Sequence, residues 1–251
     1  MSYVEYERHG AVVVLRANRP ERGNALGSHM ITDLIEASDR FRDDDSARVA
    51  IWTGVDQFFC GGLDLKQVVE LGNPFIDPRT ADFFDPETLS KPVIAAINGW
   101  ATGAGMIKVL ECTELRVMSE DAVMRMAEIR YGYPARWQYG ATYSLTPTEA
   151  AEIVYGLDIS AQRALEMGLV NRVVPGDKLM DTTMEIAQYL ASQPPLAVTA
   201  TKELLHKVTP TLPHEIEEEG WKLVRKLVMS KDGMEGIRAF VEKRDPVYKG
   251  V

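Results

Sequence analysis

The 251-residue chain has only two cysteines, four histidines and no apolar run approaching the roughly 20 residues that a membrane-spanning helix needs. Cys60 and Cys112 form no metal-ligand pattern, and the histidines are scattered along the chain. We therefore expect no metal site. The surroundings of the two cysteines favour small buried thiols over nucleophiles.

Positive charge is also scarce. The chain has 28 lysines and arginines against 37 aspartates and glutamates, a formal net charge of −9. This balance argues against a nucleic-acid-binding surface, although a local basic patch for a phosphorylated ligand remains compatible with it. The first five residues lack the basic flank and apolar stretch of a secretion signal. We expect a cytoplasmic protein with neither a nucleic acid nor a membrane as partner.

Apolar periodicity predicts the elements. Alternating and continuous apolar runs indicate strands, and apolar residues three or four positions apart indicate helices. The N-terminal part alternates between these patterns, which predicts an α/β fold of repeated ββα units, and the chain beyond Ser160 is mostly helical in pattern. The runs place strands at 3–7, 11–16, 49–53 and 93–97, and helices at 28–42, 63–71, 161–167, 179–193 and from about residue 104.

Two glycine-rich segments each follow a buried strand and precede a helix. One contains Gly61 and Gly62, and the other contains Gly103, Ala104 and Gly105. A helix start presents unpaired backbone N–H groups, and glycine lets a ligand oxygen approach the backbone closely. Tight packing alone could explain either segment. Together, two such amides from different loops are what an oxyanion hole requires.

Several further motifs occur along the chain in a specific order. In that order the chain resembles the crotonase family, the enoyl-CoA hydratase/isomerase superfamily. The resemblance implies a spiral of ββα units followed by a C-terminal helical region. It also implies an acyl-CoA substrate, no cofactor beyond the CoA of that thioester, and a homotrimer or homohexamer. The matching pieces are Asn18-Arg19-Pro20, Asn24-Ala25-Leu26, Gly61-Gly62-Leu63-Asp64-Leu65, Lys91-Pro92-Val93-Ile94-Ala95-Ala96-Ile97-Asn98-Gly99, Ser160-Ala161-Gln162-Arg163-Ala164, Gly168-Leu169-Val170, and Gly236 with Phe240-Val241-Glu242-Lys243-Arg244.

The resemblance also assigns binding residues. By position, the backbone N–H groups of Leu63 and Ala104 hold the thioester carbonyl and stabilise an enolate. Asp64 is expected to order its own loop as a cap rather than to react. The residues expected around the CoA are Arg19, Asn24, Ala25, Leu26, Gly62, Asp64, Lys66 and Lys243.

Proton transfer needs a side chain, and here the chain departs from the family's hydratases, which use two glutamates. Ile107 stands at one of these positions and Glu128 at the other. One carboxylate can take a proton from one carbon and return it to another, whereas adding water is easier with both a base and a proton donor. Ile107 beside Glu128 would raise the proton affinity of that carboxylate by desolvation. The pattern therefore resembles the family's isomerases more than its hydratases.

The segment after Glu128 is aromatic and basic where the family is glycine-rich. Tyr131, Tyr133 and Trp137 are expected to shape a substrate pocket with Ile107, or else to pack between subunits. Glu111, one turn beyond Ile107, either reaches the pocket or forms a structural ion pair.

Three functions remain open from the sequence. The first is an enoyl-CoA isomerase or hydratase that uses one glutamate, the second is acyl-CoA decarboxylation or another enolate reaction, and the third is a non-catalytic CoA-ester-binding subunit. Pro194 and Pro195 mark the clearest internal boundary. We expect a catalytic core over 1–193 and a helical region over 194–251 that packs in an oligomer. Residues 72–88 should form a loop whose aromatic side chains either line a pocket or anchor the loop.

Overall fold

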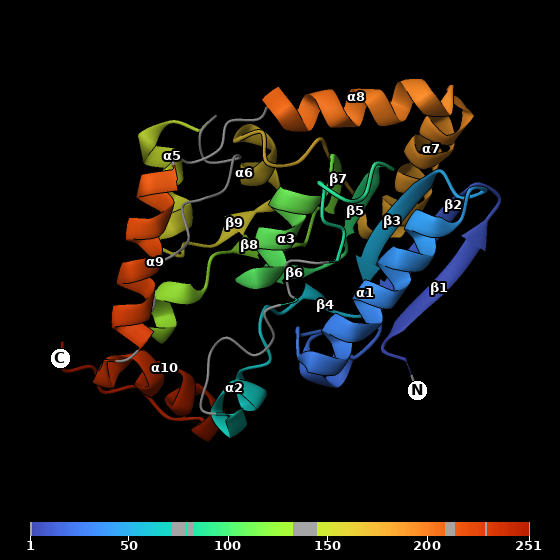
Figure 1. The fold of residues 1–251 in the computed structure, drawn as a ribbon. Coiled ribbons are helices and arrows are strands. Elements are labelled where there is room, and N and C mark those ends of the chain that lie inside the picture. The colour runs from blue at the N-terminus through green and yellow to red at the C-terminus, as the bar shows by residue number, and fades with distance from the viewer. Residues whose placement is uncertain are drawn as a thin grey trace.

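The computed structural model describes residues 2–71, 79, 83–132, 145–208, 214–228 and 230–250, with the backbone alone for 214–217. Six strands form the larger of two sheets (Figure 1). The first two strands pair antiparallel, and every later neighbour pairs parallel. In spatial order the strands are β1 (Val4–His9), β2 (Val12–Ala17), β3 (Val49–Gly54), β5 (Val93–Ile97), β7 (Leu115–Ser119) and β10 (Arg172–Val174).

A second, smaller sheet explains the repeat. Its strands are β4 (Phe58–Cys60), β6 (Trp100–Thr102), β8 (Val123–Arg125) and β9 (Ile159–Ser160). The chain passes three times from the large sheet to the small one and then into a helix. These passages are β3, β4 and α2 (Leu65–Leu71), then β5, β6 and α3 (Ala104–Cys112), then β7, β8 and the 3-10 helix η3 (Glu128–Tyr131). The predicted repeat of ββα units is confirmed.

Several boundaries differ from the sequence prediction. Helix α2 begins at Leu65 rather than at residue 63, because Asp64 caps it. The helical stretch after Ser160 is interrupted by β10, which pairs with β7. The other helices among the described residues are α1 (Ser28–Asp43), α5 (Pro147–Val154), α6 (Ala161–Glu166), α7 (Leu179–Ser192), α8 (Pro195–Val208), α9 (His214–Val228), α10 (Lys231–Glu242) and the 3-10 helices η1 (Pro20–Arg22) and η4 (Gly176–Lys178).

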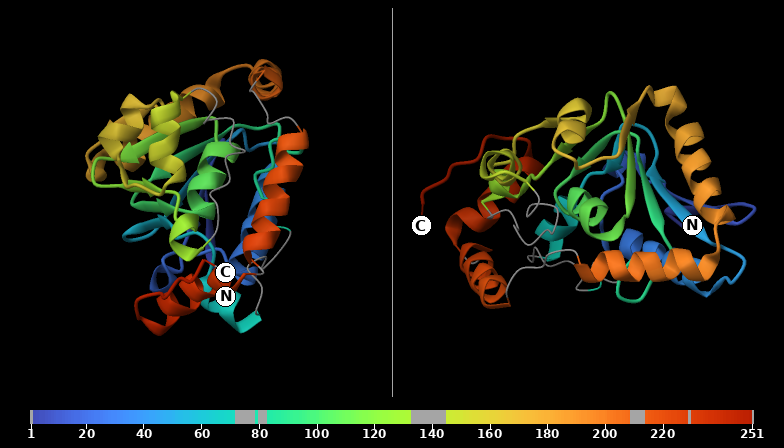
Figure 2. Two further views of the ribbon diagram at one scale, coloured as in Figure 1. Left: turned by 90° about the vertical axis from the view of Figure 1, so that its left-hand side faces the viewer. Right: turned by 90° about the horizontal axis from the view of Figure 1, so that it is seen from above.

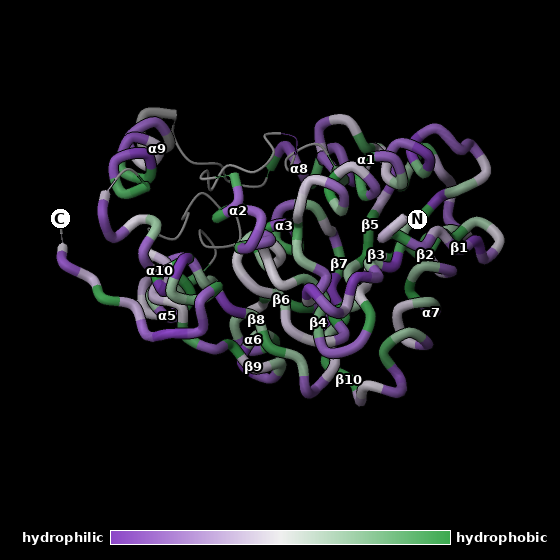
Figure 3. Tube along the Cα trace, turned by 90° about the horizontal axis from the view of Figure 1, so that it is seen from below, coloured by the Kyte–Doolittle hydropathy of each residue, from purple (hydrophilic) through white to green (hydrophobic). Residues whose placement is uncertain are grey.

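The large sheet is covered on both faces, so its central strands β3 and β5 are buried throughout (Figures 1, 2 and 3). Alternate residues of a strand point to opposite faces. Thus Val13 and Leu15 of β2 pack in the cluster that contains α1 and α3, whereas Val12 and Val14 pack against α7. Among the described helices, none is long and apolar enough to cross a membrane.

The aromatic residues at the end of the predicted loop anchor it. Phe83 and Phe84 are fully buried, and their ring centroids lie 5.9 and 5.6 Å from that of Trp52. The backbone N–H of Phe84 donates to Oγ of Ser38 on α1 at 3.1 Å. Of the two expectations for this loop, anchoring is the one that these residues fulfil, while Phe75 lies outside the described residues.

A largely buried ion pair joins α8 to the N-terminal ends of β5 and β7. Nζ of Lys202 lies 3.1 Å from Oε1 of Glu114 and donates to the carbonyl of Lys91 at 2.9 Å. The other carboxylate oxygen of Glu114 accepts the N–H of Val93 at 2.7 Å. The division of the chain at residue 193 stays a prediction, and this ion pair ties the two parts together.

Replacing Lys202 by Met should lower the free energy of unfolding by on the order of 3 kcal/mol, because it leaves a largely buried carboxylate without its cation. Lys207→Met on the same helix is the matched control, since Lys207 pairs with Glu203 at the surface, where ion pairs contribute less than about 1 kcal/mol. Urea unfolding of both variants measures the difference. Equal losses would show that the Lys202 pair is as weak as a surface pair.

Candidate active site

Three segments that carry candidate functional groups leave the small sheet at the same edge. Strands β4, β6 and β8 are parallel neighbours, so their carboxyl ends lie together. Gly61 and Gly62 follow β4, Gly103 and Ala104 follow β6, and Glu128 lies three residues beyond β8. The topology therefore gathers at one place groups from successive ββα units, with 42 residues from Gly62 to Ala104 and 24 from Ala104 to Glu128.

The two glycine-rich turns touch. Gly62 has a left-handed backbone with φ 83°, and a Cβ there would lie 2.8 Å from the carbonyl oxygen of Thr102 and 3.5 Å from the backbone nitrogen of Ala104. A side chain at position 62 would force the turns apart. Glycine is required here for both its conformation and its size.

The amides of Leu63 and Ala104 are positioned by their neighbours. Leu26 forms a parallel bridge with Leu63, in which the N–H of Leu26 donates to Gly62 at 2.7 Å and the N–H of Asp64 donates to Leu26 at 3.1 Å. Successive peptide groups of an extended segment point to opposite sides, so the N–H of Leu63 points away from Leu26. Ala104 is the first residue of α3, where a backbone N–H has no intrahelical acceptor.

Helix α3 is held at its other end by a buried guanidinium. The side chain of Arg116 donates to the carbonyl oxygens of Val109 (3.1 Å), Leu110 (2.9 Å), Thr113 (2.7 Å) and Leu169 (3.3 Å). Burial lowers the pKa of Arg116 to about 10. A cation at a helix C-terminus satisfies its last carbonyls and opposes the helix dipole. Arg116 thereby fixes the helix whose first amide, that of Ala104, is a candidate oxyanion donor.

The carboxylate of Glu128 lies against the second turn. Its Oε1 is 3.3 Å from the position that a Cβ on Gly103 would occupy, and its Oε2 is buried. Gly103 has φ 50° and directly precedes Ala104. The structure therefore brings the carboxylate next to the turn that presents the Ala104 amide, which is the arrangement that proton transfer beside an oxyanion hole requires.

Helix α3 carries the two other positions considered for proton transfer, Ile107 and Glu111. Ile107 lies one turn into α3, is 6% exposed, and its N–H donates to Gly103 at 3.0 Å. Glu111, one turn further, is exposed at the helix surface. The apolar Ile107 thus occupies the first turn of α3, the helix whose N-cap residue Gly103 lies beside the Glu128 carboxylate.

The two cysteines are buried, as the sequence predicts. Burial raises the pKa of the Cys60 thiol to about 12, although the backbone N–H of Gly62 hydrogen-bonds to it, and burial raises the pKa of Cys112 to about 11. Neither thiol is ionised near neutral pH, so neither is suited to act as a nucleophile. Within the described part of the chain, no three His, Cys, Asp or Glu residues are grouped to hold a metal ion.

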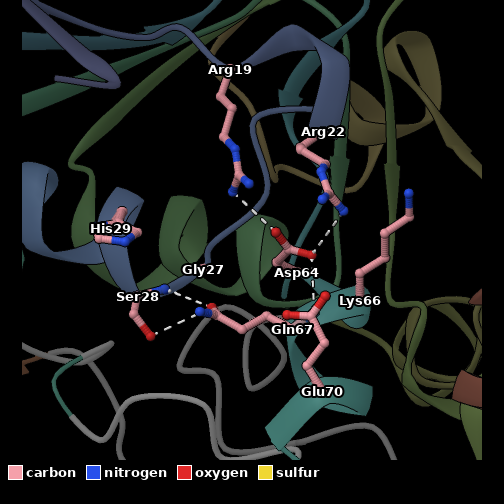
Figure 4. A pocket seen from close by; sticks show the side chains of 9 residues that line it. All are labelled: Arg19, Arg22, Gly27, Ser28, His29, Asp64, Lys66, Gln67 and Glu70. Carbon is pink, nitrogen blue, oxygen red and sulfur yellow. Dashed lines mark hydrogen bonds and ion pairs between the residues drawn. The ribbon is translucent and has the colours of Figure 1, made fainter. Parts of the chain in front are cut away.

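A polar pocket lies beside the Gly62 loop. Figure 4 shows the side chains of Arg19 and Arg22 converging on Asp64, with nitrogen-to-oxygen distances of 3.0 and 3.8 Å. Nε of Arg19 and Nη1 of Arg22 are buried without a hydrogen-bond acceptor among the described residues. Sequence reasoning missed Arg22, because an arginine near a loop is usually solvated. The lining residues are Arg19, Arg22, Gly27, Ser28, His29, Asp64, Lys66, Gln67 and Glu70.

Asp64 caps α2, as the sequence predicts. Its Oδ1 accepts the N–H of Gln67 at 3.3 Å. The same carboxylate holds Arg19, so one buried side chain orders both the loop after β4 and the guanidinium beside it. Lys66 lines the pocket from the first turn of α2.

Asn24, Ala25 and Leu26 lie in a loop packed beside Gly62 rather than in open contact with solvent. Asn24 is fully buried: its Oδ1 accepts the N–H of Arg19 at 2.8 Å, and its Nδ2 donates to Val55 and Phe58 at 3.0 and 2.6 Å. Ala25 is 6% exposed and Leu26 1%. These side chains therefore hold the loop, and their contribution to ligand binding would come from the backbone.

Two further predicted residues, Tyr131 and Lys243, lie at helix α10. The ring of Tyr131 is perpendicular to that of Phe240 on α10, with centroids 5.7 Å apart, and burial raises the pKa of its hydroxyl. Lys243 ends α10 in a left-handed conformation and is exposed. Tyr133 and Trp137 lie outside the described residues, so their place in a substrate pocket stays a prediction.

Comparison with known proteins finds relatives of this chain in sequence and in structure. A sequence model of the family described as enoyl-CoA hydratase/isomerase matches residues 7–251. A carnitinyl-CoA dehydratase from Salmonella enteritidis is 37% identical, over 97% of each protein. The crystal structure of carnitinyl-CoA hydratase from Mycobacterium avium is 28% identical, with a TM-score of 0.83 and 100% coverage of both chains. That of an enoyl-CoA hydratase/isomerase from Mycobacterium paratuberculosis is 31% identical, with a TM-score of 0.76 over 99% of this chain and 98% of that one.

The contact between the two turns can be tested with paired glycine variants. Gly62→Ala and Gly168→Ala both place alanine at a positive φ, which costs about 1–2 kcal/mol, but a Cβ at Gly168 meets no atom within 4 Å. We expect Gly62→Ala to lose about 2 kcal/mol more because its Cβ clashes with the Thr102 carbonyl. Chemical denaturation measures both losses, and equal values would contradict the close approach.

Proposed function

Since the chain belongs to the enoyl-CoA hydratase/isomerase family and is therefore an acyl-CoA enzyme, we propose that Glu128 transfers a proton at the α-carbon of the thioester. The thioester carbonyl would accept hydrogen bonds from the backbone N–H groups of Leu63 and Ala104. The observation that carries this proposal is the carboxylate of Glu128 beside Gly103, immediately before the Ala104 amide.

The arrangement suits enolate chemistry. When a proton leaves the α-carbon, negative charge develops on the thioester oxygen. Two fixed amides at a helix start stabilise that charge, and each such donor contributes on the order of 3 kcal/mol to the transition state. The carboxylate takes the proton, and CoA enters only as part of the substrate.

For the overall reaction we propose addition or removal of water across the α–β bond, because the 37%-identical relative is a carnitinyl-CoA dehydratase. One carboxylate is sufficient if the elimination is syn. Glu128 takes the α-proton, the β-carbon–oxygen bond breaks, and Glu128 passes the proton to the departing hydroxide, which leaves as water. The carboxylate then returns to its starting state.

Isomerisation is the second candidate, and Ile107 favours it. The apolar side chain stands where the family's hydratases place a second glutamate. With one carboxylate, a proton taken from one carbon of the acyl chain is returned to another, and the double bond moves. Both reactions share the first proton transfer and differ in whether the β-oxygen is lost.

We further propose that the pocket around Asp64 holds phosphate groups of the CoA. Three of its side chains are cationic, Arg19, Arg22 and Lys66, and two are acidic, Asp64 and Glu70. Guanidinium nitrogens that have no hydrogen-bond acceptor among the described residues suit phosphate oxygens. The pocket adjoins the Gly62 loop, so a CoA bound there would direct its thioester toward the candidate oxyanion hole.

Association into a homotrimer or homohexamer remains a proposal. Large apolar side chains are exposed along α8, including Leu196 at 83%, Leu204 at 62% and Val208 at 73%. Several large apolar side chains exposed on one helix would be covered by packing against another subunit.

Glu128→Gln should abolish exchange of the α-protons of butanoyl-CoA in D2O, a probe of enolate formation that involves neither hydration nor isomerisation. The amide keeps the shape of the side chain but cannot accept the proton. Mass spectrometry of the recovered thioester measures the loss, which we expect to exceed about 100-fold. Glu111→Gln is the control, and it should retain exchange. If Glu111→Gln lost α-proton exchange while Glu128→Gln retained it, Glu111 rather than Glu128 would be the residue that transfers the proton.

The two overall reactions are separated with the unaltered protein. Formation of an α–β double bond from 3-hydroxybutanoyl-CoA or carnitinyl-CoA supports the dehydratase, and conversion of but-3-enoyl-CoA to but-2-enoyl-CoA supports the isomerase. The absence of turnover on all three, together with absent α-proton exchange, would contradict the proposed activity.

Arg22→Met should raise the dissociation constant of CoA about tenfold, because one charge-assisted phosphate contact is lost while the methylene packing is kept. Arg42→Met on α1 is the control, since within the described part of the chain Arg42 pairs with the surface carboxylates of Asp39 and Asp43. Isothermal titration with CoA and with inorganic pyrophosphate gives both constants. An unchanged affinity for both ligands would exclude Arg22 from the CoA site.

A further inference from the structure

The segment that carries Glu128 is held only weakly by its internal hydrogen bonds. Helix η3 is four residues long, a length at which 3-10 hydrogen bonds hold a segment only weakly. Its outer side chains, Ile129 and Arg130, are exposed. The position of the Glu128 carboxylate therefore depends on what packs against η3.

Helix α10 packs against η3 at backbone distance. A Cβ on Gly236 would lie 2.6 Å from Cα of Tyr131, and a Cβ on Gly132 would lie 2.7 Å from the carbonyl oxygen of Asp232. The same helix contacts α2, which follows the Gly62 loop (Figure 1). One C-terminal helix thus adjoins both halves of the site.

The last residues of the chain complete this contact. We define residues 244–250 as the C-terminal segment. The hydroxyl of Tyr248 donates to the carbonyl oxygen of Arg130 in η3, 118 residues away in sequence. The same hydroxyl lies against Gly236, where a Cβ would be 2.5 Å from it. Tyr248 therefore lies between α10 and η3 and contacts both.

Two carboxylates of α10 hold the C-terminal segment in turn. Asp232 accepts the backbone N–H groups of Lys249 and Gly250 at 2.8 and 2.7 Å. Glu235 accepts the N–H of Val247 at 2.9 Å and pairs with the Arg244 guanidinium through both oxygens, at 2.6 and 3.0 Å. These bonds fix the C-terminal segment on both sides of Tyr248, whereas a segment without such bonds would be poorly ordered.

We propose that the C-terminal segment is a positioning element of the active site, and that Tyr248 holds η3 so that the Glu128 carboxylate stays beside the Gly103–Ala104 turn. This rests on the proposed function for the role of Glu128, but not for the physical link between Tyr248 and η3. Tyr248 acts through the backbone of Arg130 and touches no reacting atom.

Tyr248→Phe removes only the hydroxyl and is the first test. We expect the maximal rate of α-proton exchange on butanoyl-CoA to fall about fivefold, the ratio that corresponds to one ordinary hydrogen bond, with the KM for the thioester unchanged. Amide hydrogen exchange of residues 127–132 should become faster by a similar factor. Tyr189→Phe on α7, whose side chain is exposed, is the control and should change neither quantity.

Asp232→Asn is the second variant, because it weakens the hold on the C-terminal segment without touching η3. It should change the reaction rate and the protection of η3 in the same direction as Tyr248→Phe. Unaltered protection of residues 127–132 in both variants would overturn the proposal, as would faster amide exchange with an unaltered reaction rate. If the unaltered protein fails to exchange the α-protons, the proposed function fails, while the protection measurement still decides whether Tyr248 holds η3.

Discussion

The close approach of the Gly62 loop to the Gly103–Ala104 turn is the constraint on which the rest of the site depends. Two backbone amides can act on one oxygen only if the loops that carry them touch. Position 62 tolerates no Cβ, because the Thr102 carbonyl lies 2.8 Å from where it would be. The alternation of the chain between two sheets supplies this contact, since it brings the ends of β4 and β6 side by side.

Stability and site geometry are linked through α3. The first amide of this helix is a candidate oxyanion donor, and its last carbonyls accept hydrogen bonds from the buried Arg116. The body of the helix packs in the main apolar cluster through Met106 and Val109. Because the helix is held at its C-terminal end and along its length, its N-terminus has a fixed direction, which a preorganised electrostatic site requires.

The sequence predicts the structural features that are set by residues close together in the chain. The strand over 93–97 and the ββα repeat follow from continuous apolar runs, and the cap at Asp64 follows from its place before a helix. The sequence does not mark the individual strands β4, β6 and β8, because three residues are too few to show a period. Helix α2 starts two residues later than predicted for the same local reason: the apolar pattern begins before the cap.

The candidate site likewise combines residues that the sequence identifies with residues that only the fold reveals. Gly62, Ala104 and Glu128 could be selected from the sequence through their motifs, but their proximity comes from strand pairing. Arg22 and Tyr248 carry no local signal at all, because their partners lie far along the chain. Residues whose importance arises from long-range contacts become visible only when the fold is known.

The bond between Tyr248 and Arg130 also has a consequence for biosynthesis. A ribosome makes the chain from its N-terminus, and the sheets, whose last strand ends at Val174, can assemble on the emerging polypeptide. The partner of Arg130 follows it by 118 residues, so their bond cannot form until that stretch has also been synthesised. The segment that holds Glu128 therefore reaches its final contacts later than the sheets do, and a nascent chain can be folded before its candidate site is complete.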